Sequence, residues 1–123
     1  MALHALVVDD SMALRRSVMY ALQRLETLVC VEAQDGAEAI KKLSQQRFDV
    51  VLTDINMPVL DGLKLISHIR ADPERRALPI VVITTESADE DRARAMNLGA
   101  SAYLVKPVQA KEVLDTVTRL LAL

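Results

Sequence analysis

Aromatic residues and cysteines are scarce in this chain of 123 residues. Only 2% of the residues are aromatic although 51% are hydrophobic, so aliphatic side chains must build the core. The single cysteine, Cys30, lies in an apolar run. A disulfide within the chain is therefore excluded, and we expect a buried thiol in a reducing compartment.

Long apolar runs and an excess of basic residues are also absent. No run reaches the ~18 residues that a membrane span needs. The N-terminal apolar stretch ends in two acids and has no basic leader, unlike a signal peptide. We therefore expect a cytoplasmic protein without a membrane partner. The formal net charge of −2 gives no support for nucleic-acid binding.

Short apolar runs alternate with segments of helical periodicity, in five repetitions. The pattern predicts strands at 6–8, 28–31, 49–53, 80–83 and 102–105. It predicts helices at 14–25, 35–43, 61–72, 87–99 and from about 109 onward, the first with a stripe of Leu14, Val18, Leu22 and Leu25. Asp35 with Glu38, and Ser87 with Glu90, have the spacing of capping boxes. Such a chain is expected to form one α/β domain over residues 1–123, a parallel sheet covered by helices on both faces, without an output domain.

Chemically active side chains follow four of the five predicted strands. Asp9 and Asp10 come after the first strand, Asp54 after the third, Thr84 after the fourth and Lys106 after the fifth. Ligands of open parallel sheets bind at the carboxyl ends of the strands. The fold is therefore expected to collect three carboxylates, a hydroxyl and an ammonium at one edge.

Three carboxylates in one pocket repel one another, and a divalent cation would relieve that repulsion. Mg²⁺ prefers oxygen ligands and shares its coordination sphere with phosphate oxygens, so the cluster points to Mg²⁺ and a phosphoryl ligand. A carboxylate can itself attack phosphorus and form an aspartyl phosphate. Taken singly, the acid pair could be a helix-start charge pair, Thr84 a cap and Lys106 a surface lysine. Only the agreement of all four strand ends favours the phosphoryl site.

Four segments resemble the receiver family of two-component signalling, in particular its stand-alone, CheY-like members. The segments are Val7 to Ser11, Leu52 to Gly62, Ile83 to Glu86 and Gly99 to Pro107. The resemblance extends over essentially the whole chain. It implies a doubly wound, flavodoxin-like fold with five helices and the strand order 2-1-3-4-5.

The resemblance also implies a role for the acidic residues. Asp54 would be the phosphoacceptor, Asp10 a direct ligand of Mg²⁺, and Asp9 a ligand largely through water. The backbone carbonyl of Asn56 would be the third protein ligand. By the same resemblance, the phosphodonor is a histidine kinase, and the chain is no enzyme beyond its own phosphorylation and dephosphorylation.

Three further residues acquire roles in this way. Thr84 would be the switch hydroxyl, Tyr103 the aromatic side chain that follows it, and Lys106 the partner of the phosphoryl group. The bond between Lys106 and Pro107 would be cis, which only an X-Pro bond adopts at low cost. An output protein would bind the face made by the fourth helix, the fifth strand and the fifth helix. The domain would be a monomer or a weak dimer that depends on phosphorylation.

Some alternatives stay open. The domain could be a phosphotransfer intermediate or phosphate sink, or a receiver cut from a larger regulator. An aspartate-nucleophile phosphatase is disfavoured, because Asn56 stands where such enzymes carry a second acid. A dinucleotide-binding fragment is disfavoured by the absence of glycine from residues 9–12. Thr85 is larger than the usual residue after the switch hydroxyl, and Glu86 and Asn56 lie at positions that tune phosphate lifetime in relatives.

Overall fold

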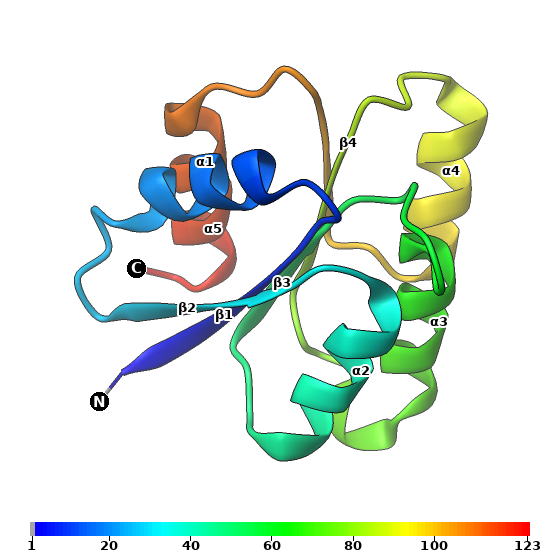
Figure 1. Ribbon diagram of the computed structural model, residues 1–123, viewed down its shortest axis with the longest axis horizontal. Coiled ribbons are helices and arrows are strands. Elements are labelled where there is room, and N and C mark those ends of the chain that lie inside the picture. The colour runs from blue at the N-terminus through cyan, green and yellow to red at the C-terminus, as the bar shows by residue number, and fades with distance from the viewer. Residues whose placement is uncertain (1) are drawn as a thin grey trace.

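The computed structural model describes residues 2–123 and has a five-stranded parallel sheet in the order β2-β1-β3-β4-β5 (Figure 1). The predicted strand order is therefore confirmed, and each strand is followed by a helix. The elements are β1 (Leu3–Val8), α1 (Met12–Leu22), β2 (Leu28–Ala33), α2 (Gly36–Gln45), β3 (Val50–Thr53), α3 (Gly62–Ala71), the 3₁₀ turn η1 (Pro73–Arg75), β4 (Ile80–Thr84), α4 (Asp89–Leu98), β5 (Ala102–Val105) and α5 (Ala110–Leu120). Among the described residues, no helix is long and apolar enough to cross a membrane.

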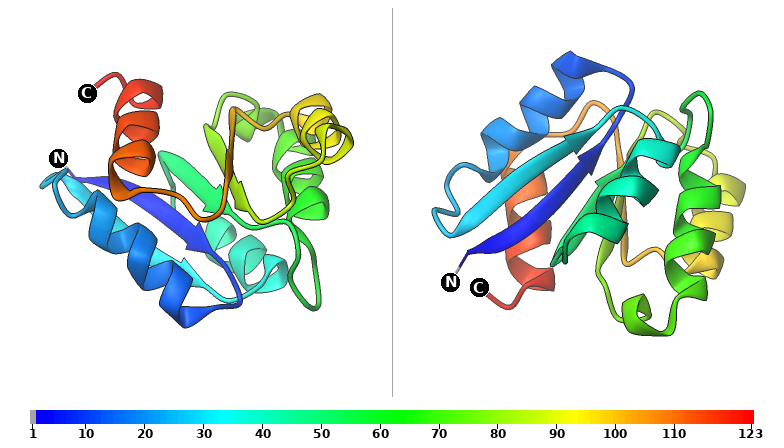
Figure 2. Two further views of the ribbon diagram at one scale, coloured as in Figure 1. Left: turned by 90° about the horizontal axis from the view of Figure 1, so that it is seen from above. Right: turned by 60° about the horizontal axis from the view of Figure 1, so that its bottom comes forward.

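Helices cover both faces of the sheet, α1 and α5 one face and α2, α3 and α4 the other (Figure 2). Successive residues of a strand point to opposite faces. In β1, Leu6 and Val8 therefore pack on the α2–α3–α4 side, and Ala5 and Val7 pack on the α1–α5 side. This burial on both sides explains why the strands read as continuous apolar runs rather than as alternating patterns.

Polar side chains fix the beginnings of three helices. Ser11 Oγ, Asp35 Oδ1 and Asp61 Oδ1 each accept a hydrogen bond from the backbone N–H three residues onward, at 3.3, 2.8 and 2.9 Å. Each bond satisfies an amide that has no partner within the helix. The predicted start of α2 at Asp35 is confirmed.

The predicted capping box of α4 is wrong. The helix begins after Ala88, and no side chain caps its first turn. Ser87 is therefore one position too early to serve as the cap, and the acids of the first turn meet the positive end of the helix dipole instead. Within α4, whose residues are all described, only Ala95 is buried. This helix is thus anchored to the body of the domain by little apolar surface.

The first helix is shorter than its apolar stripe predicted. It ends at Leu22, and Leu25 lies in the turn toward β2, where it packs against the core on the α1–α5 side. Leu14, expected to face the core, is 37% exposed. It belongs to the first turn of α1, at the carboxyl edge of the sheet, and lines a cleft there.

Candidate functional site

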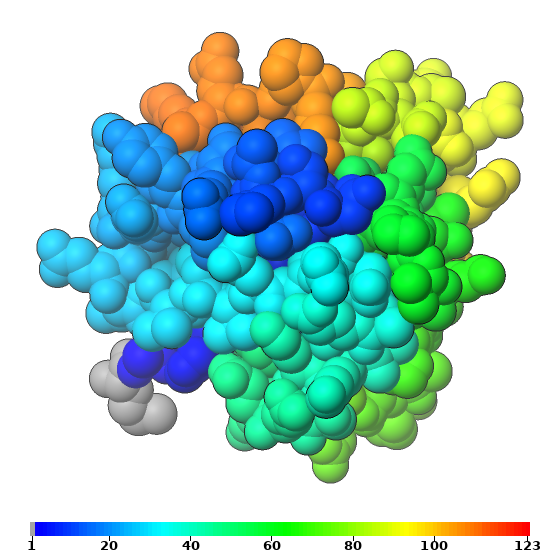
Figure 3. All heavy atoms as spheres, in the orientation of Figure 1, coloured from blue at the N-terminus to red at the C-terminus, as the bar shows by residue number. Residues whose placement is uncertain are grey.

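The carboxylates that follow β1 and β3 lie together, because these two strands are neighbours in the sheet. One carboxylate oxygen each from Asp9, Asp10 and Asp54 lies within 4.8 Å of the other two. Asp9 and Asp54 are buried and Asp10 is exposed. In Figure 3 the dark blue segment after β1 reaches the surface beside the green β3–α3 loop and beneath the orange segment that follows β5. The cluster is therefore open to solvent on one side.

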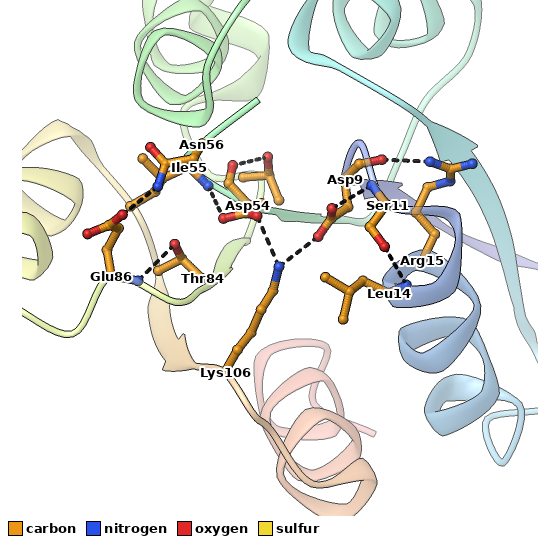
Figure 4. Close-up of polar contacts among 11 residues, drawn as sticks. Asp9, Ser11, Leu14, Arg15, Asp54, Ile55, Asn56, Thr84, Glu86 and Lys106 are labelled. Atoms are coloured by element: carbon orange, nitrogen blue, oxygen red, sulfur yellow. Dashed lines mark hydrogen bonds and ion pairs between the residues drawn. The ribbon is translucent and has the colours of Figure 1, made fainter. Parts of the chain in front are cut away.

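Lys106 completes the cluster from the end of β5. Its Nζ lies 3.0 Å from Asp9 Oδ2 and 3.0 Å from Asp54 Oδ2, between the two buried carboxylates (Figure 4). Burial alone would lower the pKa of the Lys106 ammonium, but its bonds to Asp54 and Asp9 outweigh burial and raise the pKa. Burial also raises the pKa of the Asp9 carboxyl, and the bonds from Ser11 and Lys106 oppose this only in part. One ammonium thus serves two carboxylates, and the site keeps an excess of negative charge.

Backbone contacts hold Asp54 at the edge of the sheet. Its Oδ1 accepts a bond of 2.6 Å from the Ile55 amide, and its own amide donates to the Val8 carbonyl at 3.1 Å. Gly62 passes directly beneath, because its amide bonds the Ile55 carbonyl at 2.8 Å and a Cβ there would lie 2.0 Å from the Asp54 carbonyl oxygen. Only a glycine allows α3 to begin so close to this peptide. Lys106 and the following Pro107 are joined by a cis peptide bond.

The three carboxylates fit a magnesium ion in chemistry and in spacing. They offer hard oxygen donors at one point of the molecule, on the side open to solvent. With Mg–O bonds of about 2.0–2.1 Å, the oxygens that bind one ion are roughly 3–4 Å apart. The three carboxylate oxygens lie within 4.8 Å of one another, which is compatible with this spacing. Asn56 lies two residues beyond Asp54, and its side chain bonds Glu86; its carbonyl as a ligand stays a prediction.

Comparison with known proteins identifies the family. The model of the response regulator receiver domain matches residues 5–118 of the chain. The chain belongs to this family. A chemotaxis protein of Vibrio cholerae, CheY-3, is 41% identical to the receiver domain over 115 residues, which cover 91% of this chain and 88% of that protein. A gliding motility regulatory protein of Myxococcus xanthus is 38% identical over 112 residues, 91% of this chain but 14% of that longer protein.

Solved structures agree with this assignment. The chemotaxis response regulator CheY4 of Vibrio cholerae superimposes with a TM-score of 0.89 at 34% identity, covering 98% of this chain and 99% of that one. The receiver domain of a sensor histidine kinase from Pseudomonas aeruginosa superimposes with a TM-score of 0.89 at 28% identity, with full coverage of both chains. That structure has a magnesium ion coordinated in its active site cleft.

Glu86 links three elements of the receiver domain that sequence reasoning treated separately. Its carboxylate accepts a bond of 2.5 Å from the Asn56 side-chain amide, and its carbonyl accepts one of 2.7 Å from the Tyr103 hydroxyl. Its amide donates to Thr84 Oγ1 at 3.3 Å, the longest of the three. Burial raises the pKa of the Tyr103 hydroxyl, followed by the charges of Asp91 and Glu86. The β4–α4 loop is therefore tied to the β3–α3 loop and to β5 through one residue.

A cleft adjoins the carboxylates on the α1–α5 side of the receiver domain. Its volume is about 420 Å³, and most of its lining is apolar. Asp9, Asp54 and Lys106 form part of its wall, and its lining also includes Leu14, Ser17, Thr85, Pro107 and Val108. Thr85, singled out from the sequence for its size, thus lines the same cleft as Asp54.

Arg15 is a neighbour of the site that the sequence pattern did not reveal. It lies on α1, four residues beyond Ser11, and donates to the Asp9 carbonyl (Figure 4). Arg15 does not follow a strand, and its side chain reaches back from a helix to the edge of the sheet. Its only sequence signal is its position in the first turns after the acid pair.

Proposed function

We propose that this receiver domain accepts a phosphoryl group on Asp54 from the phosphohistidine of a histidine kinase, in a reaction that depends on Mg²⁺. A carboxylate oxygen of Asp54 would attack phosphorus, the P–N bond to the kinase imidazole would break, and the imidazole would leave with a proton from solvent. The domain would catalyse only its own phosphorylation and dephosphorylation. The observation that carries this proposal is the position of Asp54, buried between the acid pair and Lys106.

Charge explains why these side chains suit the reaction. The transferred group is anionic, and negative charge spreads over its oxygens in the transition state. Lys106, 3.0 Å from Asp54, is placed to bond such an oxygen. Mg²⁺ held by Asp9, Asp10 and Asp54 would supply the remaining positive charge. A cytoplasmic location fits the composition of the chain, since a free thiol such as that of Cys30 stays reduced there.

The cleft beside Asp54 supports a protein as phosphodonor. Leu14 on α1, and Pro107 and Val108 in the β5–α5 loop, line this cleft together with Asp54 and give it apolar surface. A small phosphodonor needs no such surface, whereas a protein partner presents apolar side chains that can cover it.

We further propose that phosphorylation switches the binding of an output protein to the face of α4, β5 and α5. Thr84 would donate its hydroxyl proton to a phosphoryl oxygen. Movement of the hydroxyl toward that oxygen would break the bond that it accepts from the Glu86 amide, which is already long at 3.3 Å. A shift of Glu86 would carry the Tyr103 hydroxyl with it. The weak anchoring of α4 makes this face the easiest to rearrange. The ligand can move this equilibrium only by binding the two states with different affinity.

Phosphorylation by phosphoramidate tests the acceptor, because that donor carries the same type of P–N bond as phosphohistidine. Wild-type protein with Mg²⁺ should gain one phosphate by intact mass, and Asp54→Asn should gain none. Asp115→Asn, on the exposed surface of α5, is the matched control and should be modified like wild type. Equal labelling of the Asp54 variant would refute the assignment.

Nuclear magnetic resonance with beryllofluoride, a phosphoryl mimic, tests the switch. Shift changes beyond the site should concentrate between about Ser87 and Leu120. Changes spread mainly over α1 and α2 would show that the signal leaves the site by another route.

A further inference from the structure

Arg15 makes two short bonds next to the carboxylate cluster. Its side chain is only 13% exposed. Nη1 donates to the Asp9 carbonyl at 2.7 Å, and Nε pairs with Glu32 Oε1 at 2.9 Å. Glu32 belongs to β2, the strand whose end supplies no member of the cluster. The guanidinium therefore joins the edge strand to the backbone of the acid pair.

The bonded carbonyl belongs to the peptide unit between Asp9 and Asp10. This peptide unit is planar, so a hydrogen bond to its oxygen limits the rotation of the whole unit. The bond thereby limits the direction in which the Asp10 side chain points. The carboxylate of Asp9 is held independently, by the Ser11 amide at 2.9 Å and by Lys106 at 3.0 Å. Asp10 is exposed, so its position depends on the backbone.

We propose that Arg15, held by Glu32, is a positioning residue for the metal site. It orients the Asp9–Asp10 peptide so that the two carboxylates keep the spacing that one divalent cation requires. Residues that hydrogen-bond to metal ligands commonly orient those ligands in this way. The inference rests on the magnesium site of the proposed function and names two residues outside the carboxylate cluster.

Electrostatics alone predicts the opposite effect for the loss of Arg15. Removal of a positive charge near three carboxylates should strengthen the binding of a cation. Loss of orientation should weaken it. The sign of the change in Mg²⁺ affinity therefore separates a positioning role from a simple charge effect.

The test is a titration with Mg²⁺ alone, followed by amide shifts in nuclear magnetic resonance. Arg15→Gln should raise the dissociation constant for Mg²⁺ about tenfold. This is the lower end of the effects of replacing residues that hydrogen-bond to metal ligands. Arg15→Lys keeps the charge but cannot make both bonds of a guanidinium fork, so it should also weaken binding, to a smaller extent. Glu32→Gln should weaken Mg²⁺ binding to about the same extent as Arg15→Lys. Arg16→Gln, exposed on the same helix, is the matched control and should bind as tightly as wild type or more tightly.

Melting in EDTA provides the readout for a purely structural role. If the Arg15 variants melt lower but keep the wild-type dissociation constant, Arg15 only supports the fold and the inference is overturned. Unchanged or tighter binding in Arg15→Gln overturns it as well. If Arg15→Gln does not fold, an unchanged Mg²⁺ affinity in both Arg15→Lys and Glu32→Gln overturns the inference. A wild type without saturable Mg²⁺ shifts would instead refute the magnesium site itself.

Discussion

Replacement of Lys106 by methionine should strongly destabilise the metal-free domain. The ammonium lies 3.0 Å from oxygens of both Asp9 and Asp54, and the three side chains are 10%, 8% and 11% exposed. Methionine keeps much of the length and apolar volume of the lysine stem. The variant would therefore leave two buried carboxylates near each other without their nearest cation.

Two opposing energies set the size of this effect. At 3 Å, two unit charges attract by roughly 5 kcal/mol at an effective dielectric constant of about 20. Burial of the ammonium offsets several kcal/mol of this attraction in the wild type. Loss of one partner of a buried pair typically costs about 3–5 kcal/mol. A loss near 3 kcal/mol lowers the melting temperature of a domain of this size by roughly 10 °C.

Thermal melts in EDTA at neutral pH measure the effect. Lys111→Met is a matched control, because Lys111 lies 2.8 Å from Asp115 but the two side chains are 83% and 59% exposed. Its melting temperature should stay close to that of wild type, since solvent already screens that pair. The difference between Lys106→Met and wild type should narrow as the pH falls, because one of the crowded carboxylates can then take up a proton.

Saturating Mg²⁺ should stabilise Lys106→Met more than wild type, since a cation bound only by the native state offsets the repulsion. The reasoning fails if Lys106→Met and Lys111→Met melt at the same temperature in EDTA. Equal Tm values would mean that Lys106 does not balance a buried excess of negative charge.

Three other changes test separate features. Gly62→Ala should lower stability by about 1–3 kcal/mol, as overpacking does, because its Cβ would meet the Asp54 carbonyl at 2.0 Å; an unchanged melting temperature would contradict this. Val59 has φ of +67° and is 82% exposed, so Val59→Asn should relieve backbone strain. It should raise stability by about 1 kcal/mol, and a lower Tm would count against strain there. Burial raises the pKa of Asp9, so in EDTA the native state takes up this proton at higher pH than the unfolded chain. The stability of wild type relative to Asp9→Asn should therefore grow as the pH falls from neutral through that raised pKa. A stability difference that does not depend on pH would contradict the raised pKa of Asp9.

Local sequence was enough to predict the layers of the fold. Apolar runs such as 80–83, bounded by helical periodicities, identify strands buried on both faces. Alternation of strand and helix then requires parallel pairing, because a crossover must return the chain to the same edge. The same rule predicts that Asp9, Asp54 and Lys106 lie together, although 97 positions separate Asp9 from Lys106. The strand order 2-1-3-4-5 came from the family resemblance and not from these patterns.

Helix boundaries were less predictable, because local signals compete there. Ser87 and Glu90 have the spacing of a capping box, but α4 begins after Ala88, and no side chain caps its first turn. Leu25 continues the stripe of α1, but the turn toward β2 interrupts the helix after Leu22. A capping side chain contributes only about 1 kcal/mol, so such a local motif is easily outweighed by the packing of the whole domain.

Only the tertiary structure could reveal the contacts that join loops and helices across the carboxyl edge of the sheet. The bonds of Glu86 to Asn56 and Tyr103 span 30 and 17 positions, and the pair of Arg15 and Glu32 spans 17. Such contacts leave no periodicity in the sequence, because they depend on where long side chains reach after the backbone has folded. Strand ends follow from short apolar runs in the local sequence, whereas these hydrogen bonds depend on the packing of elements that are distant in sequence.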